Sequence, residues 1–246
     1  MPTKASINCS LSDIRVRFRR ACTALKLHSN RFANPFYRRY ICIPLYISMK
    51  SSPKTKLFVE PLDASNWNDF ELLFGERGAC GGCWCMSWRL MRSEFDAGKG
   101  AKNKSAMKRL VRKGEPTGLL AYDGDQPVGW LSMAPREEFV RLQTSRVLRP
   151  VDDLPVWSLP CLFIAKEWRR KGVSVILLRA AIQHAKQNGI SILEGYPEEP
   201  YDENIPAAFA WKGIPSSFKK AGFVVAEQRT PKKPIMRYYC SKKQGK

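Results

Sequence analysis

One segment, residues 161–174, constrains the fold of this chain more than any other. It runs from an apolar strand pattern through three consecutive cations and Gly172 into an amphipathic helix, which the spacing predicts over 173–188. The first amide groups of a helix have no partners within the helix and bind anions, and a glycine there lets the backbone approach a phosphate. The segment predicts a diphosphate site in an α/β domain; the alternative is a helix start with solvated charges. The residues concerned are Arg169, Arg170, Lys171, Gly172, Val173 and Ser174.

Several other functional classes are excluded by what the sequence lacks. It contains neither the P-loop pattern Gly-x-x-x-x-Gly-Lys-Ser/Thr nor the dinucleotide pattern Gly-x-Gly-x-x-Gly. It has two histidines, His28 and His184, too few for a His-rich zinc site, and neither is placed as the base of a catalytic triad. We expect His184 on the inner face of the 173–188 helix, as a buried histidine rather than a proton shuttle. No apolar run approaches the roughly 18 residues that a membrane helix needs.

Hydrophobic periodicity over the rest of the chain predicts a mixed sheet covered by helices. The order is β-α-α-β-β-β-α-β-α-β-β, which indicates a single α/β (α+β) domain. Asp63 to Ser65 predicts the N-cap of the first helix, and Asp123-Gly124 predicts a hairpin. In chain order the expected elements are 57–61, 67–73, 104–113, 119–122, 128–133, 157–165, 173–188, 190–193, 216–221, 223–227 and 235–239, with a long loop over 135–155.

The net charge of +20 is unevenly distributed. Residues 1–50 carry ten Lys and Arg side chains against one acid, Asp13. This basic leader has three interpretations: an organelle transit segment, a nucleic-acid-binding arm, or an over-long start with Met49 as the true first residue. The folded domain is expected over 56–239, with a short basic tail over 240–246.

Eight cysteines suggest free thiols, because no signal peptide precedes them and the chain is long enough to build a core without disulfides. We therefore expect a cytoplasmic protein, with organelle import if the leader is a transit segment. Cys80 and Cys83 form half of a zinc motif whose other half is absent, so no metal is expected. A redox role for this pair is equally weak. An acyl-enzyme on Cys161 or Cys85 lacks a histidine base.

Three motifs in the expected order resemble the GNAT acetyltransferase superfamily over about residues 56–239. Arg169-x-x-Gly172-x-Ser174 is similar to the family's Arg/Gln-x-x-Gly-x-Gly/Ala signature. The order of elements matches, and the stretch Ser217 to Phe223 resembles the family's helix that ends in Gly-Phe. Further segments resemble a bacterial subgroup with mostly unassigned acceptors: Cys83-Trp84-Cys85-Met86, Trp88-Arg89, Pro127-Val128-Gly129-Trp130, Ala134-Pro135-Arg136-Glu137, Val156-Trp157-Ser158 and Glu194-Gly195-Tyr196-Pro197.

The resemblance implies a mostly antiparallel sheet, splayed between its fourth and fifth strands, and acetyl-CoA as the cosubstrate. The diphosphate would bind the amides of residues 170–174. The pantetheine arm would pair with the backbone of Leu162, Phe163 and Ile164 like an additional strand. A backbone N–H of Phe163 or Ile164 would stabilise the oxyanion.

The resemblance also implies an acid that protonates the departing thiolate, a Tyr in many family members. The corresponding residue here is Phe218, which has no hydroxyl, so Tyr196 and Tyr201 are the candidates instead. Glu194 is the candidate base that deprotonates the amine, with a salt bridge or a strand-end cap as the equal alternative.

The acceptor is expected to be an unidentified primary amine, on a small molecule or on a protein. Its pocket is expected to include Cys83, Trp84, Cys85, Met86 and Trp88. Arg141 or Arg146, in the long loop, would hold a carboxylate of the acceptor. The alternative function is a non-catalytic acyl-CoA sensor or a nucleic-acid-associated module. No membrane partner is expected, and the oligomeric state is open, a homodimer included.

Overall fold

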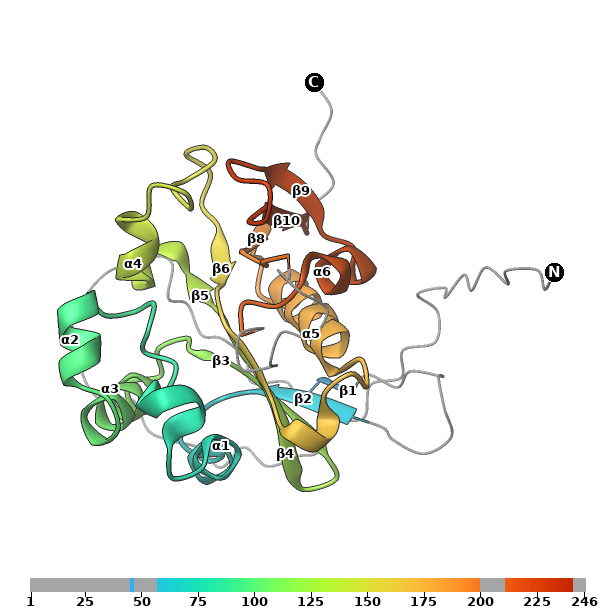
Figure 1. The fold of residues 1–246 in the computed structure, drawn as a ribbon. Helices are drawn as coiled ribbons and strands as arrows, with labels where there is room; N and C mark the ends of the chain where they lie inside the picture. Colours follow the sequence, from blue (N-terminus) through green and yellow to red (C-terminus); the bar gives the residue numbers. More distant parts are fainter. Residues whose placement is uncertain (1–44, 47–56, 200–210, 241–246) are drawn as a thin grey trace, which may run out of the picture.

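The computed structural model describes residues 45–46, 57–199 and 211–240, and the strands of this part form two five-stranded sheets (Figure 1). The first sheet has the order β1-β2-β3-β4-β7, and the second has the order β5-β6-β8-β10-β9. Within the described residues every strand pair is antiparallel except β6 and β8. The strands are β1 (Leu45–Tyr46), β2 (Leu57–Pro61), β3 (Gly118–Asp123), β4 (Gln126–Ser132), β5 (Ala134–Pro135), β6 (Trp157–Leu159), β7 (Leu162–Ile164), β8 (Ile192–Gly195), β9 (Val224–Glu227) and β10 (Ile235–Tyr239).

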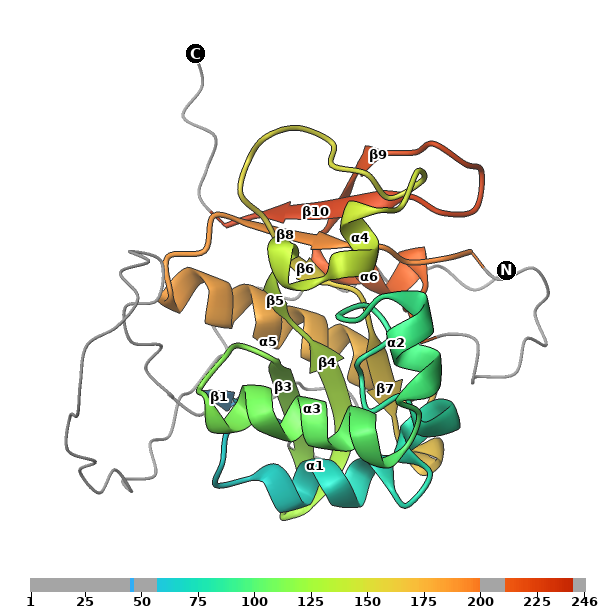
Figure 2. The ribbon, with the colours of Figure 1, turned by 90° about the vertical axis from the view of Figure 1, so that its left-hand side faces the viewer.

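Helices cover both faces of the first sheet. Figure 2 shows α1 and α3 in front of β3 and β4, with α5 behind them. None of the helices in the described ranges is long and apolar enough to cross a membrane. The α-helices are α1 (Trp67–Phe74), α2 (Arg92–Ala97), α3 (Ala101–Arg112), α4 (Val140–Gln143), α5 (Val173–Gln187) and α6 (Pro215–Ala221).

Alternating side chains of β3 divide the core between these two helix layers. Leu119 and Ala121 face the α5 side, whereas Leu120 and Tyr122 pack with α1 and α3. A third apolar cluster includes Phe139, Leu142 of α4, Trp88 and Ile235 of β10. The first sheet is therefore buried on both faces.

The two sheets separate at a break in the predicted strand 157–165. Its first part, β6, pairs in parallel with β8, and its second part, β7, pairs with β4 of the other sheet. Pro160 lies between them, and a proline has no N–H to continue a ladder. Beyond Pro160, β7 and the chain that follows β8 diverge. This confirms the splay that the resemblance implied, and the gap is called the splay below.

Several local expectations need correction. The N-cap of α1 is Asn66, and the Asp63 carboxylate instead accepts a hydrogen bond from the N–H of Ser65. Helix α2 was not expected, and α3 begins at Ala101 rather than at Lys104. The long loop 135–155 contains a turn of 3-10 helix and α4. Only Leu45 and Tyr46 of the basic leader are described, and they pair with β2.

Candidate functional site

One edge of β7 faces the splay. On the other edge, the N–H of Ala165 donates to Val128 and the carbonyl of Cys161 accepts from Ser132, so these residues point toward β4. Backbone direction alternates along a strand, so Leu162 and Ile164 point away from β4 while Phe163 points toward it. Of the two oxyanion donors considered above, only the Ile164 amide therefore faces the splay.

Part of this edge is already in use. The N–H of Leu162 donates to the carbonyl of Trp211 over 2.6 Å, and the carbonyl of Ile164 accepts from Arg169 Nε over 3.1 Å. Within the described residues, these bonds leave the Leu162 carbonyl and the Ile164 amide unpaired on the edge that faces the splay. The edge can therefore pair with one amide unit of an extended ligand, which is less than the three-residue pairing expected from the sequence.

The basic turn lies directly after this edge. Arg169 to Gly172 connects a short 3-10 helix to α5, and Gly172, at φ 80°, occupies the N-cap position in the left-handed conformation. Arg170 and Lys171 are exposed. Ser174, in the first turn of α5, donates to Ser217 of α6 over 3.3 Å. The turn presents the N-terminal amides of a fifteen-residue helix together with two exposed cationic side chains, of which Lys171 lies over the Trp168 ring. This is the chemistry of an anion site.

Glu194 is fully buried and is the centre of an ion-pair network. One of its oxygens accepts from Arg136 over 2.8 Å, and the other accepts from Arg237 Nε over 2.7 Å. Arg237 also forms two hydrogen bonds to Asp152. Both oxygens of Glu194 are therefore engaged by guanidinium groups, the salt-bridge arrangement considered above. Its role as a base stays a prediction.

Tyr196 belongs to the same network. Its hydroxyl donates to Glu194 over 2.7 Å, accepts from Arg136 over 2.6 Å and lies 2.7 Å from Ser158 Oγ. Burial, and then the charge of Glu194, raise the pKa of Tyr196 well above its usual value. The phenol stays protonated, but it is enclosed by protein. Tyr201, the other candidate acid, lies outside the described residues.

The partners of Glu194 were not predicted from the sequence. Arg136 is part of one of the motifs that carry the resemblance, whereas Arg237 belongs to none of them. The available signal was a charged residue at an alternating position of an otherwise apolar strand, 235–239, since such a residue needs a buried partner. Phe218, at the position of the usual Tyr, is fully buried against Gly195.

The expected acceptor residues form a wall rather than an open surface. Trp84, Cys85, Met86 and Trp88 are buried, and Cys83 is partly buried. The wall is tied to neighbouring elements, because Trp84 stacks on Phe74 and Trp88 contacts Trp211 beside the splay. Arg141 lies over the Trp88 ring and donates to the carbonyl and the hydroxyl of Ser87. Its contact with an acceptor stays a prediction.

The cysteines of this wall are free thiols. Cys80 is exposed and the Cys83 thiol donates to the carbonyl of Gly78 over 3.5 Å. Cys85 is buried, and Cys161 is partly exposed at the splay. In the part of the chain that the structure describes, no three Cys, His, Asp or Glu side chains are grouped as metal ligands.

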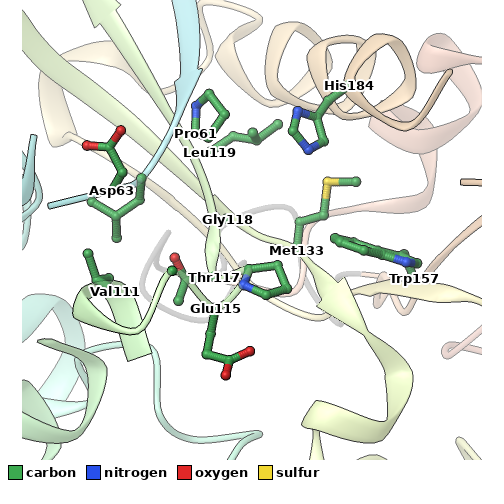
Figure 3. A pocket seen from close by; sticks show the side chains of 13 residues that line it. Pro61, Asp63, Val111, Glu115, Thr117, Gly118, Leu119, Met133, Trp157 and His184 are labelled. Atoms are coloured by element: carbon green, nitrogen blue, oxygen red, sulfur yellow. The ribbon is translucent and has the colours of Figure 1, made fainter. Parts of the chain in front are cut away.

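A separate cavity of about 200 Å³ lies at the other end of α5 (Figure 3). His184, Met133 and Trp157 gather on one side of it, and Glu115 lies on the other. Burial lowers the pKa of His184 from 6.5 to about 4. This histidine is therefore neutral at physiological pH and belongs to the inner face of α5, away from the splay.

The depressed pKa of His184 predicts a pH-dependent loss of stability. The unfolded chain binds a proton below pH 6.5, whereas the folded chain does so only near pH 4, so unfolding is favoured as the pH falls through this window. The free energy of unfolding should fall by up to about 3 kcal/mol from this group. Urea titrations at pH 7, 5.5 and 4.5 would measure the fall, and the free energy of unfolding of His184→Gln should depend less on pH. The same pH dependence in the two proteins would show that His184 is not the titrating group.

Comparison with known proteins identifies the family. The model of the acetyltransferase (GNAT) family matches residues 84–209, just over half of the chain. The search of the curated proteins finds no match to this sequence. Similar solved structures include the PaiA N-acetyltransferase of Thermoplasma acidophilum in complex with coenzyme A, with 16% identity over 75% of this chain and 99% of that chain and a TM-score of 0.42.

Two further solved structures are similar at the same distant level. An uncharacterized protein of Bacillus halodurans has 14% identity over 80% of this chain and 90% of that chain, with a TM-score of 0.49. The ribosomal-protein-S18-alanine N-acetyltransferase of Escherichia coli has 11% identity over 76% and 95%, with a TM-score of 0.39. Together with the splayed mixed sheet and the basic turn at the start of α5, the family match shows that the chain belongs to the GNAT acetyltransferase family.

Proposed function

We propose that the protein transfers the acetyl group of acetyl-CoA to a primary amine. The observation that carries this proposal is the hydrogen bond from Arg169 Nε to the carbonyl of Ile164, which joins the basic turn to the edge of β7. A ligand with a diphosphate at one end and an extended amide arm at the other fits both features at once. CoA has this shape and charge.

Different residues of the chain bind different parts of this ligand. Arg170, Lys171 and the first amides of α5 bind the diphosphate. The Leu162 carbonyl and the Ile164 amide pair with the pantetheine arm. The acyl end then extends toward Cys161, because the diphosphate end lies at the opposite end of β7. The Cys83–Met86 segment favours the bacterial subgroup with unassigned acceptors, so the amine is left unspecified.

Neutralising the basic turn should weaken CoA binding. In the double variant Arg170→Gln/Lys171→Gln, calorimetry should show a Kd for CoA at least roughly tenfold higher, since each lost charge-assisted contact to phosphate is worth about 1.5 kcal/mol or more. Lys102→Gln is the control, because Lys102 is an exposed cation on α3. Equal Kd values for the two variants would contradict the proposal that the diphosphate of CoA binds at this turn.

Turnover separates the proposed enzyme from the alternative sensor. Release of CoA from acetyl-CoA would be followed by chromatography with a panel of primary amines and amine-bearing peptides. The proposal requires release that depends on an amine. A protein that binds CoA without such release throughout the panel would fit the sensor.

A further inference from the structure

The cavity at the C-terminal end of α5 has no part in the proposed function. Its walls come from α3, β3, β6, α5 and the residues that follow β2 and β4 (Figure 3). Most of these walls are apolar, and the side chains that form them are Leu62, Val111, Leu119 and Met133, all buried, and the partly exposed Trp157. A volume of about 200 Å³ has room for about six water molecules or for one small organic molecule.

A buried hydroxyl in the wall of this cavity lacks a hydrogen-bond partner. Thr117 is 1% exposed, and within the described residues its Oγ1 bonds to no other group. The carbonyl of the same residue accepts from the N–H of Met133 over 3.0 Å, so the sheet fixes the backbone that carries the hydroxyl. A buried hydroxyl without a partner destabilises the folded chain, and native proteins usually pair such a group with protein, water or a ligand.

His184 provides a second polar group, on the other side of the cavity from Thr117 (Figure 3). Its ring is neutral at physiological pH. Burial alone accounts for its lowered pKa, so within the described part of the chain no charged group and no hydrogen bond acts on the ring. A neutral imidazole has one donor and one acceptor. The cavity therefore contains two polar side chains with unused hydrogen-bonding capacity, and both are uncharged.

The two carboxylates that line the cavity are placed differently. Asp63 already accepts hydrogen bonds from the N–H and the hydroxyl of Ser65. The side chain of Glu115 extends away from His184 in Figure 3. Among the described residues that line the cavity there is no Lys or Arg, although the chain has 42 of them. The cavity therefore has no partner for an anionic ligand, and its two carboxylates would repel one.

Water alone fits these walls poorly. An ordered water needs two to four polar partners, so about six waters would need many more partners than Thr117 and His184 offer. A molecule with an apolar body and one polar group needs fewer, and its body would contact the apolar side chains directly. Ligand pockets in proteins commonly have this composition, with apolar walls and a few polar groups that orient the ligand.

We propose that this cavity binds a small, uncharged, mainly apolar molecule that carries one hydroxyl group. The apolar body would lie between Leu119, Met133 and Trp157. The hydroxyl would bond to Thr117 Oγ1, which can both donate and accept, and His184 supplies a further donor and acceptor. This site is separate from the proposed acetyl transfer, because His184 is in the last turn of α5 and the basic turn precedes the first.

Phenol is a suitable probe, since it combines an apolar ring with one hydroxyl. It would be added to the full chain carrying ¹³C in the methyl groups of its seven methionines, and their signals would be followed by NMR. A bound aromatic ring shifts the signals of nearby methyl groups, so the Met133 signal should move and saturate with a Kd of about 1 mM or lower. Met133→Leu would assign this signal. The signal of Met236, which pairs with Gly195 near the splay, should not move.

Toluene tests the hydroxyl, because it has nearly the same shape as phenol but no hydroxyl. The wild type should bind phenol at least roughly fivefold more tightly than toluene, although toluene is the more hydrophobic of the two. Thr117→Val keeps the shape of the side chain but removes its hydroxyl, so it should abolish this preference. Thr144→Val is the matched control, since Thr144 is exposed at the end of α4, and it should retain the preference of the wild type.

Several results would overturn the inference. Toluene binding as tight as that of phenol would show an apolar cavity that does not use Thr117. The absence of a saturable Met133 shift with either probe would show that the cavity holds water only. Tighter binding of benzoate or benzylammonium would show that the ligand is charged, and displacement of phenol by CoA would place the phenol at the splay. The CoA titrations test the proposed acetyltransferase separately, so either conclusion can fail without the other.

Discussion

Glu194→Gln is expected to lower the free energy of unfolding by about 3 kcal/mol or more. Glu194 is 0% exposed, and its two oxygens separately accept guanidinium hydrogen bonds from Arg136 and Arg237. The substitution keeps the shape but removes the charge, so two buried guanidinium groups lose their common partner. Arg237, 1% exposed, retains Asp152, whereas Arg136 retains only neutral acceptors within the described residues. Urea-induced unfolding at pH 7 would measure the loss.

The matched control is Glu198→Gln. Glu198 pairs with Lys212 and Lys233, but these side chains are partly exposed, and water screens such pairs. The same chemical change should cost less than about 1 kcal/mol there. Similar losses at the two positions would show that the network around Glu194 is not the cause.

Once an acceptor is found, the Glu194→Gln variant also tests whether Glu194 acts as the base that deprotonates the amine. Turnover would be measured in the fully folded fraction, at a temperature well below the unfolding transition. Unchanged kcat would end the role of base and leave Glu194 as a structural residue. A fall in kcat with unchanged CoA affinity would support that role.

The fold was predictable where local signals and tertiary packing agree. Strands β2 and β10 appear over the expected residues, and α5 ends one residue before the expected limit, because apolar spacing alone identifies their buried faces. Helix α2 was missed because Phe95 is its single buried residue, which leaves no periodic pattern to detect. The first N-cap was misplaced by one residue, since Asp63, Ser65 and Asn66 all have side chains suited to capping.

Only the part of the site that is formed by consecutive residues could be predicted from the sequence. The basic turn directly follows β7 in the chain, so a single sequence pattern describes both. The ion pairs of Glu194 with Arg136 and Arg237 join segments far apart in the chain. No local pattern encodes such contacts, because they depend on how the two sheets meet. The break at Pro160 was likewise hidden, since its neighbours continue an apolar strand pattern on both sides.

Gly195→Ala is the second substitution with a large expected effect. Gly195 ends β8, and a Cβ added there would overlap Cε1 of Phe218 and lie 2.7 Å from its Cζ. The ring cannot turn away, because it is fully buried and packs edge-on against Phe223 at 5.1 Å. Either α6 or β8 must therefore shift, at a cost of about 3 kcal/mol in the free energy of unfolding. CoA affinity should fall as well, since α6 contacts the first turn of α5 through Ser217 and Ser174.

A second substitution distinguishes this clash from any other effect of the added methyl group. Phe218→Leu alone should cost about 1 kcal/mol through lost contacts. If the ring is what the methyl group strikes, the double variant Gly195→Ala/Phe218→Leu should be more stable than Gly195→Ala alone, by at least about 1 kcal/mol in coupling energy from urea titrations of all four proteins. Strictly additive losses would mean that the ring is not what Gly195 accommodates. A coupling energy of this size would show that position 195 needs glycine because the Phe218 ring packs closely against it. At the end of β8, the backbone then has room for a hydrogen atom but not for a methyl group.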